Sequence, residues 1–310
     1  MVDAKSEQRL MNFNLGLRKE RGGQWRIATE STSGSKPPLQ PVTAEKLIAD
    51  MDKAGIRRAL VLSTGYYLGG AGSDNTPRLK PVNDKVKAVQ LENDWQAAQV
   101  ARYPDRLVLA CGINPMESYA IAEMVRCKQS LQARAVKMKV GEHGDKLDLN
   151  KPDDRAKLRR FFKAANDNRM AIVIHLGSDG GLGRKEVRSF LNDVVSAAPD
   201  IPIQIAHMGF ASAQALSEFA DARAAGDPLT KNLYFDLSVG SFKDLPTATG
   251  SFLAEAIRKI GLEHVLYASD TLPGDHNPPT HEHWPAMRSK LPLTEAEFRA
   301  IADNITPYIR

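Results

Sequence analysis

Three side chains that can bind a metal ion or move a proton stand at the ends of three short apolar segments. The segment MAIVIHL carries His175, IQIAHM carries His207, and VLYASD ends in Asp270. Short apolar runs bounded by polar residues predict buried strands. Parallel barrels build their active sites at the carboxyl ends of the strands, so we expect the three residues to meet at one end of such a barrel.

Two imidazoles and one carboxylate suit a divalent ion such as Zn²⁺. An ion held there would lower the pKa of a bound water or polarise a carbonyl group, and His207 or Asp270 could move the proton. For each residue alone, a hydrogen-bonded core histidine or a helix-capping aspartate is the commoner alternative. Their joint occurrence at three strand ends favours a functional site.

A regular alternation of strands and helices must position these residues, and it begins at Thr43. Expected strands are 58–63, 107–113, 135–140, 170–176, 203–208, 233–239 and 265–270; expected helices are 43–55, 83–102, 117–131, 152–166, 185–197, 211–225, 252–260 and one after the capping box at Thr294. Strict alternation predicts a parallel sheet with right-handed crossovers. Seven or eight units fit a TIM-like (β/α)8 barrel. A doubly wound sheet is disfavoured because the Gly-rich stretch 69–72 does not open a helix.

Residues 43–310 are thus expected to form the barrel domain. Residues 1–42 are expected to be a loop-rich N-terminal extension, in which 10–17 could be helical. Scattered charges with a net charge of +5 disfavour nucleic acid as a partner. No apolar run is long enough for a membrane span, and the start of the chain has no signal-peptide pattern, so a cytoplasmic location is the default. Cys111 and Cys127 are expected to be buried free thiols. A small-molecule substrate and a possible homodimer complete these expectations.

Several of these stretches resemble one known family. They are Ala206-His207 after an apolar strand, Tyr267-Ala-Ser-Asp270, the closing segment 301–309 and the early segment 43–63. Together they are similar to the amidohydrolase-related branch of the amidohydrolase superfamily over about residues 43–310. Members are metal-dependent barrels, among them decarboxylases of aminocarboxymuconate semialdehyde or resorcylate and hydrolases of cyclic lactones.

The resemblance implies roles for the three residues. His175 would be a metal ligand, His207 the catalytic or second-metal histidine, and Asp270 the metal-linked aspartate that handles the proton. The cofactor would be a divalent ion, most simply zinc. The function expected first is a metal-dependent hydrolase of a small anionic molecule such as a lactone. The alternatives are a decarboxylase of an aromatic or unsaturated acid, a barrel that has lost its metal and its activity, and a metal-free enzyme with His207 and Asp270 as an acid–base pair.

One departure from the family pattern bears on the metal. The family carries His-x-His at the end of its first strand, whereas the first histidine of this chain is His143. Either that strand lies upstream of Met1, in which case an export signal could lie there too, or the metal site has been lost. We favour the first alternative. We therefore expect weak or absent metal in the chain as written, no first barrel strand within residues 1–42, and a gap between strands 58–63 and 265–270.

Other polar residues are weaker candidates. Lys139, near a strand end, could bind a substrate carboxylate, and Tyr66 and Tyr67 could line the mouth of the barrel. His276, His281 and His283 fall in a Pro-rich stretch that is expected to be a solvated loop. The remaining polar groups are expected to be structural or exposed: His143, Asp236, Ser238 and His264.

Overall fold

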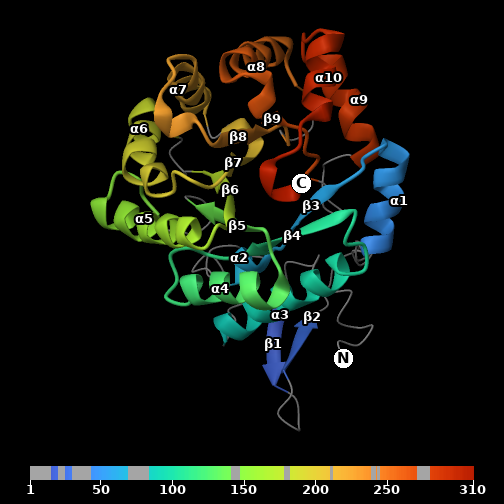
Figure 1. Ribbon diagram of the computed structural model, residues 1–310, viewed down its shortest axis with the longest axis vertical. Coiled ribbons are helices and arrows are strands. Elements are labelled where there is room, and N and C mark those ends of the chain that lie inside the picture. Colours follow the sequence, from blue (N-terminus) through green and yellow to red (C-terminus); the bar gives the residue numbers. More distant parts are fainter. Residues whose placement is uncertain are drawn as a thin grey trace.

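In a computed structural model of the 310-residue chain, seven parallel strands form a curled, TIM-like half-barrel surrounded by helices (Figure 1). The residues described are 15–19, 25–29, 43–68, 84–140, 147–177, 182–209, 212–238, 242, 245–270 and 280–310. The strands are β3 (Ala59–Leu62), β4 (Leu107–Gly112), β5 (Ala135–Val140), β6 (Ala171–Leu176), β7 (Ile203–Ile205), β8 (Leu233–Asp236) and β9 (Val265–Leu266). They follow one another in the sheet in chain order, all parallel, so the expected α/β architecture is confirmed.

Among the described residues, eight helices lie where the sequence predicts them, and two, Gly65–Leu68 and Thr280–Lys290, were not expected. In chain order, the helices are α1 (Ala44–Ala54), α2 (Gly65–Leu68), α3 (Lys85–Val100), α4 (Ala120–Leu131), α5 (Pro152–Asp167), α6 (Arg184–Asp193), α7 (Ala213–Ala224), α8 (Thr247–Ile260), α9 (Thr280–Lys290) and α10 (Glu295–Asp303). Helix α1 ends at Gly55, whose φ of 69° is the left-handed C-terminal conformation that glycine favours. The capping box predicted at Thr294 is present, with Glu297 as its partner.

Two local expectations were wrong. The stretch that contains His281 and His283 is helix α9 rather than a solvated loop, and it keeps its helical form with Pro285 inside it. Residues 15–19 are not helical: β1 (Leu15–Lys19) pairs antiparallel with β2 (Trp25–Thr29). These two strands pair only with each other and do not join the seven-stranded sheet.

The interior of the barrel is filled partly by the end of the chain. Small inward side chains of the strands, such as Ala110, Ala135 and Ala171, form a cluster with the buried Tyr308. Tyr308 belongs to a 3-10 turn, Pro307–Ile309, and its hydroxyl donates to the side chain of Gln204 on β7. The C-terminus accordingly lies within the ring of helices, between β3 and β9 (Figure 1).

The two cysteines form a disulfide that joins β4 to α4, contrary to the expectation of free thiols. Their Cα atoms are 6.4 Å apart, and both residues are fully buried. Cysteine spacing does not predict this pairing, because 16 positions separate Cys111 from Cys127 and only the packing of helix against strand brings them together.

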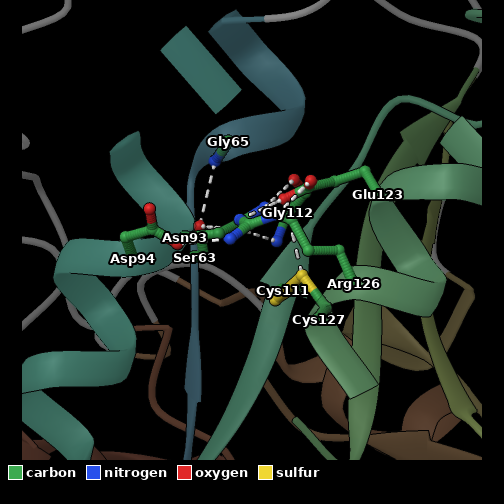
Figure 2. The surroundings of a disulfide bond; sticks show 9 residues. All are labelled: Ser63, Gly65, Asn93, Asp94, Cys111, Gly112, Glu123, Arg126 and Cys127. Atoms are coloured by element: carbon green, nitrogen blue, oxygen red, sulfur yellow. Dashed lines mark hydrogen bonds and ion pairs between the residues drawn. A yellow bond between two sulfur atoms is a disulfide. The ribbon is translucent and has the colours of Figure 1, made fainter. Parts of the chain in front are cut away.

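A buried polar network lies beside this disulfide and fixes the carboxyl ends of β3 and β4 (Figure 2). Asn93 of α3 accepts hydrogen bonds from the Ser63 hydroxyl at 2.7 Å and the Gly112 amide at 2.9 Å, and it donates to Glu123 at 2.9 Å. Arg126 completes the network by pairing with Glu123 at 2.7 Å. Position 112 must be glycine, because a Cβ there would collide with the backbone around Ser63.

Across the described ranges, no helix combines the length and the hydrophobicity that crossing a bilayer requires.

Candidate active site

His207 is held in an uncommon backbone conformation just beyond β7. Its φ of 55° and that of Met208, 58°, are both left-handed, which is costly for residues other than glycine and frequent at functional sites. The His207 amide donates to Asp236 at 3.0 Å. Its ring Nδ1 lies 2.5 Å from the carbonyl oxygen and 2.9 Å from the hydroxyl oxygen of Ser238. These contacts fix the imidazole and leave Nε2 as the atom available for proton transfer.

Asp236, at the end of β8, organises this turn from a buried position. Its carboxylate accepts from Gln204 Nε2 at 2.6 Å and from the Ser238 amide at 3.2 Å. Burial raises the pKa of Asp236, but His207 and the hydrogen bonds outweigh burial, so the pKa lies below its usual value. Asp236 and Ser238 were expected to be structural, and their contacts show what that role is: they position His207.

His175 and His207 do come together, as their strand-end positions predict. The centroids of the two rings are 4.7 Å apart with an interplanar angle of 72°. His175 stands on β6 opposite Lys139 of β5 and is partly buried.

A cavity of about 660 Å³ reaches into the barrel from this end. Its lining includes His207, Asp236, Asp270 and Lys137. Asp270 follows β9 with a left-handed φ of 47°, and its charge acts on Lys137. His207 and Asp270 therefore face one cavity, and His175 lies against His207.

Lys137 is the site residue that the sequence analysis missed. It is 5% exposed, and burial is the largest influence on its pKa, which falls to about 8 although Asp236 and Asp270 oppose the change. Its ammonium nitrogen lies 5.9 Å from the centre of the Tyr66 ring, a cation–π distance. Tyr66 is thus a neighbour of the site through this lysine.

Lys139, the lysine singled out from the sequence, is partly buried and is not among the described residues that line the cavity. Because Lys137 and Lys139 are two positions apart on one strand, both side chains point to the same face. The alternation of side chains along the strand therefore predicted the face on which both lysines lie, but not how deeply each lysine is buried. The sequence feature that could have identified Lys137 is its position nearer the middle of the apolar strand, because a charged residue in a buried strand indicates a function.

The other histidines stand apart from the cavity. His281 contacts Asp50 and joins α9 to α1, and His264 bonds to the Leu233 carbonyl at 2.7 Å. His283 is fully buried between Phe242 and Tyr267, and neither of its ring nitrogens is hydrogen-bonded to a residue that the structure describes. Burial lowers the pKa of His283 to about 4. The stretches that contain His143 and His276 lie outside the described residues, as does the side chain of Tyr67.

The residues at the cavity do not by themselves fit a metal. Among the described residues, no three or more histidine, cysteine, aspartate or glutamate side chains are arranged so that they could hold an ion. His175, His207 and Asp270 have suitable donor atoms, but a catalytic zinc site usually needs three protein ligands that converge on one point.

The comparisons with known proteins define the family. The model of the amidohydrolase family matches residues 39–304, and the chain therefore belongs to this family. No curated protein sequence matches it.

Several solved structures share the fold. 2,6-Dihydroxybenzoate decarboxylase from Rhizobium aligns with a TM-score of 0.58 and 17% identity, over 85% of this chain and 86% of that one. A dihydroxybenzoic acid decarboxylase from Polaromonas, with bound manganese and 2-nitroresorcinol, gives 0.57 and 17%, over 85% and 84%. For 5-carboxyvanillate decarboxylase from Sphingomonas paucimobilis the values are 0.55 and 17%, over 83% and 79%. At such identities the likeness shows the fold, an amidohydrolase enzyme fold, and not the substrate.

Proposed function

We propose that this protein is an amidohydrolase-family enzyme that decarboxylates a small aromatic or unsaturated carboxylic acid. The observation that carries the proposal is the buried Lys137 in the cavity that holds His207 and Asp270. A buried ammonium group needs a compensating anion, and a substrate carboxylate that entered the cavity would provide one. Decarboxylases of aromatic acids among the solved relatives of the same fold support this choice over hydrolysis.

Decarboxylation requires only that the chain bind the substrate and supply one proton. Lys137 would hold the carboxylate, with Tyr66 beside its ammonium group. When the bond between the carboxyl carbon and the substrate breaks, its electron pair stays on the substrate carbon and CO₂ leaves. That carbon then takes a proton from Asp270 in its acid form or from the His207 imidazolium, and solvent returns the proton to the donor. Because Ser238 holds Nδ1 of His207, Nε2 would be the ring nitrogen that transfers the proton.

A divalent ion is proposed as the cofactor on family grounds, and manganese in one solved relative makes zinc only one of the candidates. The described residues do not complete a metal site, and the carboxylate binding and proton transfer proposed here use only side chains of the chain.

The test is turnover of 2,6-dihydroxybenzoate, 5-carboxyvanillate and a cyclic lactone by the purified chain, with and without Mn²⁺ and with and without a chelator. We expect CO₂ release from at least one acid and none of the lactone hydrolysed. Lys137→Met should raise KM by two orders of magnitude or more, because the carboxylate loses its counter-charge, whereas the exposed Lys163→Met on α5 should behave as wild type. Hydrolysis of the lactone without decarboxylation of either acid would contradict the proposal and favour the hydrolase expected first from the sequence. No turnover of any of the three substrates would favour a barrel that has lost its activity.

The disulfide bears on the compartment. Disulfides persist mainly outside the reducing cytosol, so we propose an oxidising compartment rather than the cytoplasmic default. Fractionation of the source cells, followed by thiol labelling of the denatured protein, tests this: Cys111 and Cys127 should be found oxidised outside the cytoplasm.

A further inference from the structure

A chain of hydrogen bonds crosses the interior of the barrel from Tyr308 to His207. The Tyr308 hydroxyl donates to the side-chain oxygen of Gln204 on β7. Gln204 Nε2 donates to the Asp236 carboxylate on β8 at 2.6 Å, and the same carboxylate accepts from the His207 amide at 3.0 Å. Tyr308, Gln204 and Asp236 are at most 9% exposed, so these contacts are shielded from competing water.

The chemistry of these groups allows one orientation of the Gln204 amide. Burial raises the pKa of Asp236, but His207 and the hydrogen bonds bring it below its usual value, so the carboxylate can only accept. Gln204 must therefore turn its nitrogen toward Asp236 and its oxygen toward Tyr308. Burial raises the pKa of Tyr308, so its hydroxyl keeps the proton that the amide oxygen accepts. Without this hydroxyl, the amide loses the contact that fixes its oxygen end.

The two oxygens of Asp236 have separate partners. Oδ2 accepts from Gln204, whereas Oδ1 accepts from the His207 amide and, at 3.2 Å, from the Ser238 amide. The Gln204 contact fixes the rotation of the carboxylate, and this rotation aims Oδ1 at the turn that carries His207. The turn needs that support because the φ of His207, 55°, is left-handed, a conformation that persists only where surrounding contacts hold it.

Ser238 transmits the same influence to the imidazole ring. Its hydroxyl donates to Asp236 Oδ1, and its carbonyl oxygen lies 2.5 Å from His207 Nδ1. A carbonyl oxygen can only accept, so Nδ1 carries the hydrogen and a neutral ring has its bare nitrogen at Nε2. Asp236 therefore sets both parts of His207, the backbone amide directly and the ring through Ser238.

We propose that Tyr308 and Gln204 are positioning residues, which act through Asp236 to hold His207 in the orientation and tautomer that exchange a proton with the substrate. This role rests on the proposed function for its effect on turnover, and it assigns the proton to His207 rather than to Asp270. A purely structural role, in which Tyr308 only fills the centre of the barrel, predicts lost stability without a defined change at His207.

The first test reads the state of His207 without a substrate. Long-range ¹H–¹⁵N spectra of the chain labelled with ¹⁵N-histidine, at mildly alkaline pH, report the tautomer of each ring, and His207→Gln identifies the signals of His207. We expect one set of signals in the wild type, with the hydrogen on Nδ1. Tyr308→Phe and Gln204→Leu should each give a mixture of tautomers. His207 signals that are identical in the wild type and both variants would overturn the proposal.

The second test measures turnover of 2,6-dihydroxybenzoate or 5-carboxyvanillate, whichever acid the wild type decarboxylates. Tyr308→Phe should lower kcat roughly fivefold or more and Gln204→Leu roughly twentyfold or more. KM should stay within about twofold of the wild type, because Lys137 still binds the carboxylate. Since both residues act in one chain, kcat of the double variant should match that of Gln204→Leu within about twofold.

A matched control separates positioning from stability. Ile301→Val, in the buried core on α10 and outside the hydrogen-bonded chain, should also lower stability, yet leave kcat and the His207 tautomer unchanged. An equal loss of kcat in this control would contradict the proposal, as would effects of Tyr308→Phe and Gln204→Leu that multiply in the double variant. If the wild type decarboxylates neither acid, the proposed function fails, and the spectra of His207 alone decide the positioning role.

Discussion

Replacing Lys137 by methionine should make the protein more stable while it removes substrate binding. Burial lowers the pKa of this lysine from 10.5 to about 8, so the folded chain disfavours the charged form relative to the unfolded chain. Such a difference corresponds to roughly 3 kcal/mol at pH 7. Methionine is similar in length, fills the same space and carries no charge. We expect Lys137→Met to raise the free energy of unfolding at pH 7 by up to about 3 kcal/mol.

The pH dependence provides the sharper test. Between pH about 8 and 10.5, the unfolded chain keeps the Lys137 proton and the folded chain has lost it. The unfolded state then binds more protons, so the stability of the wild type rises with pH across this window. The advantage of Lys137→Met must shrink over the same range.

Urea unfolding at pH 7 and at pH 10 measures both effects. The exposed Lys163→Met on α5 is the control and should change the free energy of unfolding by less than about 0.5 kcal/mol at either pH. A Lys137→Met variant less stable than the wild type at pH 7 would contradict this expectation, because Asp236 and Asp270 would then more than compensate the charge of the lysine. An advantage that stays constant with pH would refute it as well.

Three further changes have defined outcomes. Burial raises the pKa of Glu92 from 4.5 to about 7, so between these pH values the folded chain holds a proton that the unfolded chain has lost. The free energy of unfolding therefore falls as pH rises through that window. In urea unfolding, Glu92→Gln should remove this pH dependence and raise the free energy of unfolding by up to about 3 kcal/mol above pH 7. Reducing the bond between Cys111 and Cys127, which closes a loop with a sequence separation of 16, should lower the free energy of unfolding by about 3 kcal/mol, and unchanged urea midpoints with and without reductant would contradict the pairing. Tyr308→Phe should cost about 1–3 kcal/mol by calorimetry, because it leaves the Gln204 side chain without its buried donor; a smaller loss would mean that water replaces the hydroxyl.

The architecture was predictable because its signal is local and repeated. Each buried strand is a short apolar run, and each helix has a periodic apolar face with recognisable ends such as Gly55. Strand ends were less predictable: the strand expected over 265–270 is β9, Val265–Leu266, and the rest of that run turns away to present Asp270. Helix α9 was missed because its composition, with Pro285 inside, is that of a loop.

The site was predictable as a set of strand ends but not as a set of contacts. That His175 and His207 approach each other follows from parallel strands ending at one rim. The depth of Lys137 depends on how the strands tilt and pack, which a single sequence does not specify. The disulfide likewise depends on the distance between β4 and α4 rather than on any cysteine spacing.

The position of Tyr308 has a consequence for how the protein folds during its synthesis. Tyr308 is part of the barrel interior, together with Ala110 and Ala135 from about 170 to 200 positions earlier in the chain. The strands that carry these alanines emerge from the ribosome long before the side chain that fills the space between them. A nascent chain can therefore form its helices and pair its strands while its centre stays open, and the interior is filled only when the segment that carries Tyr308 has been made.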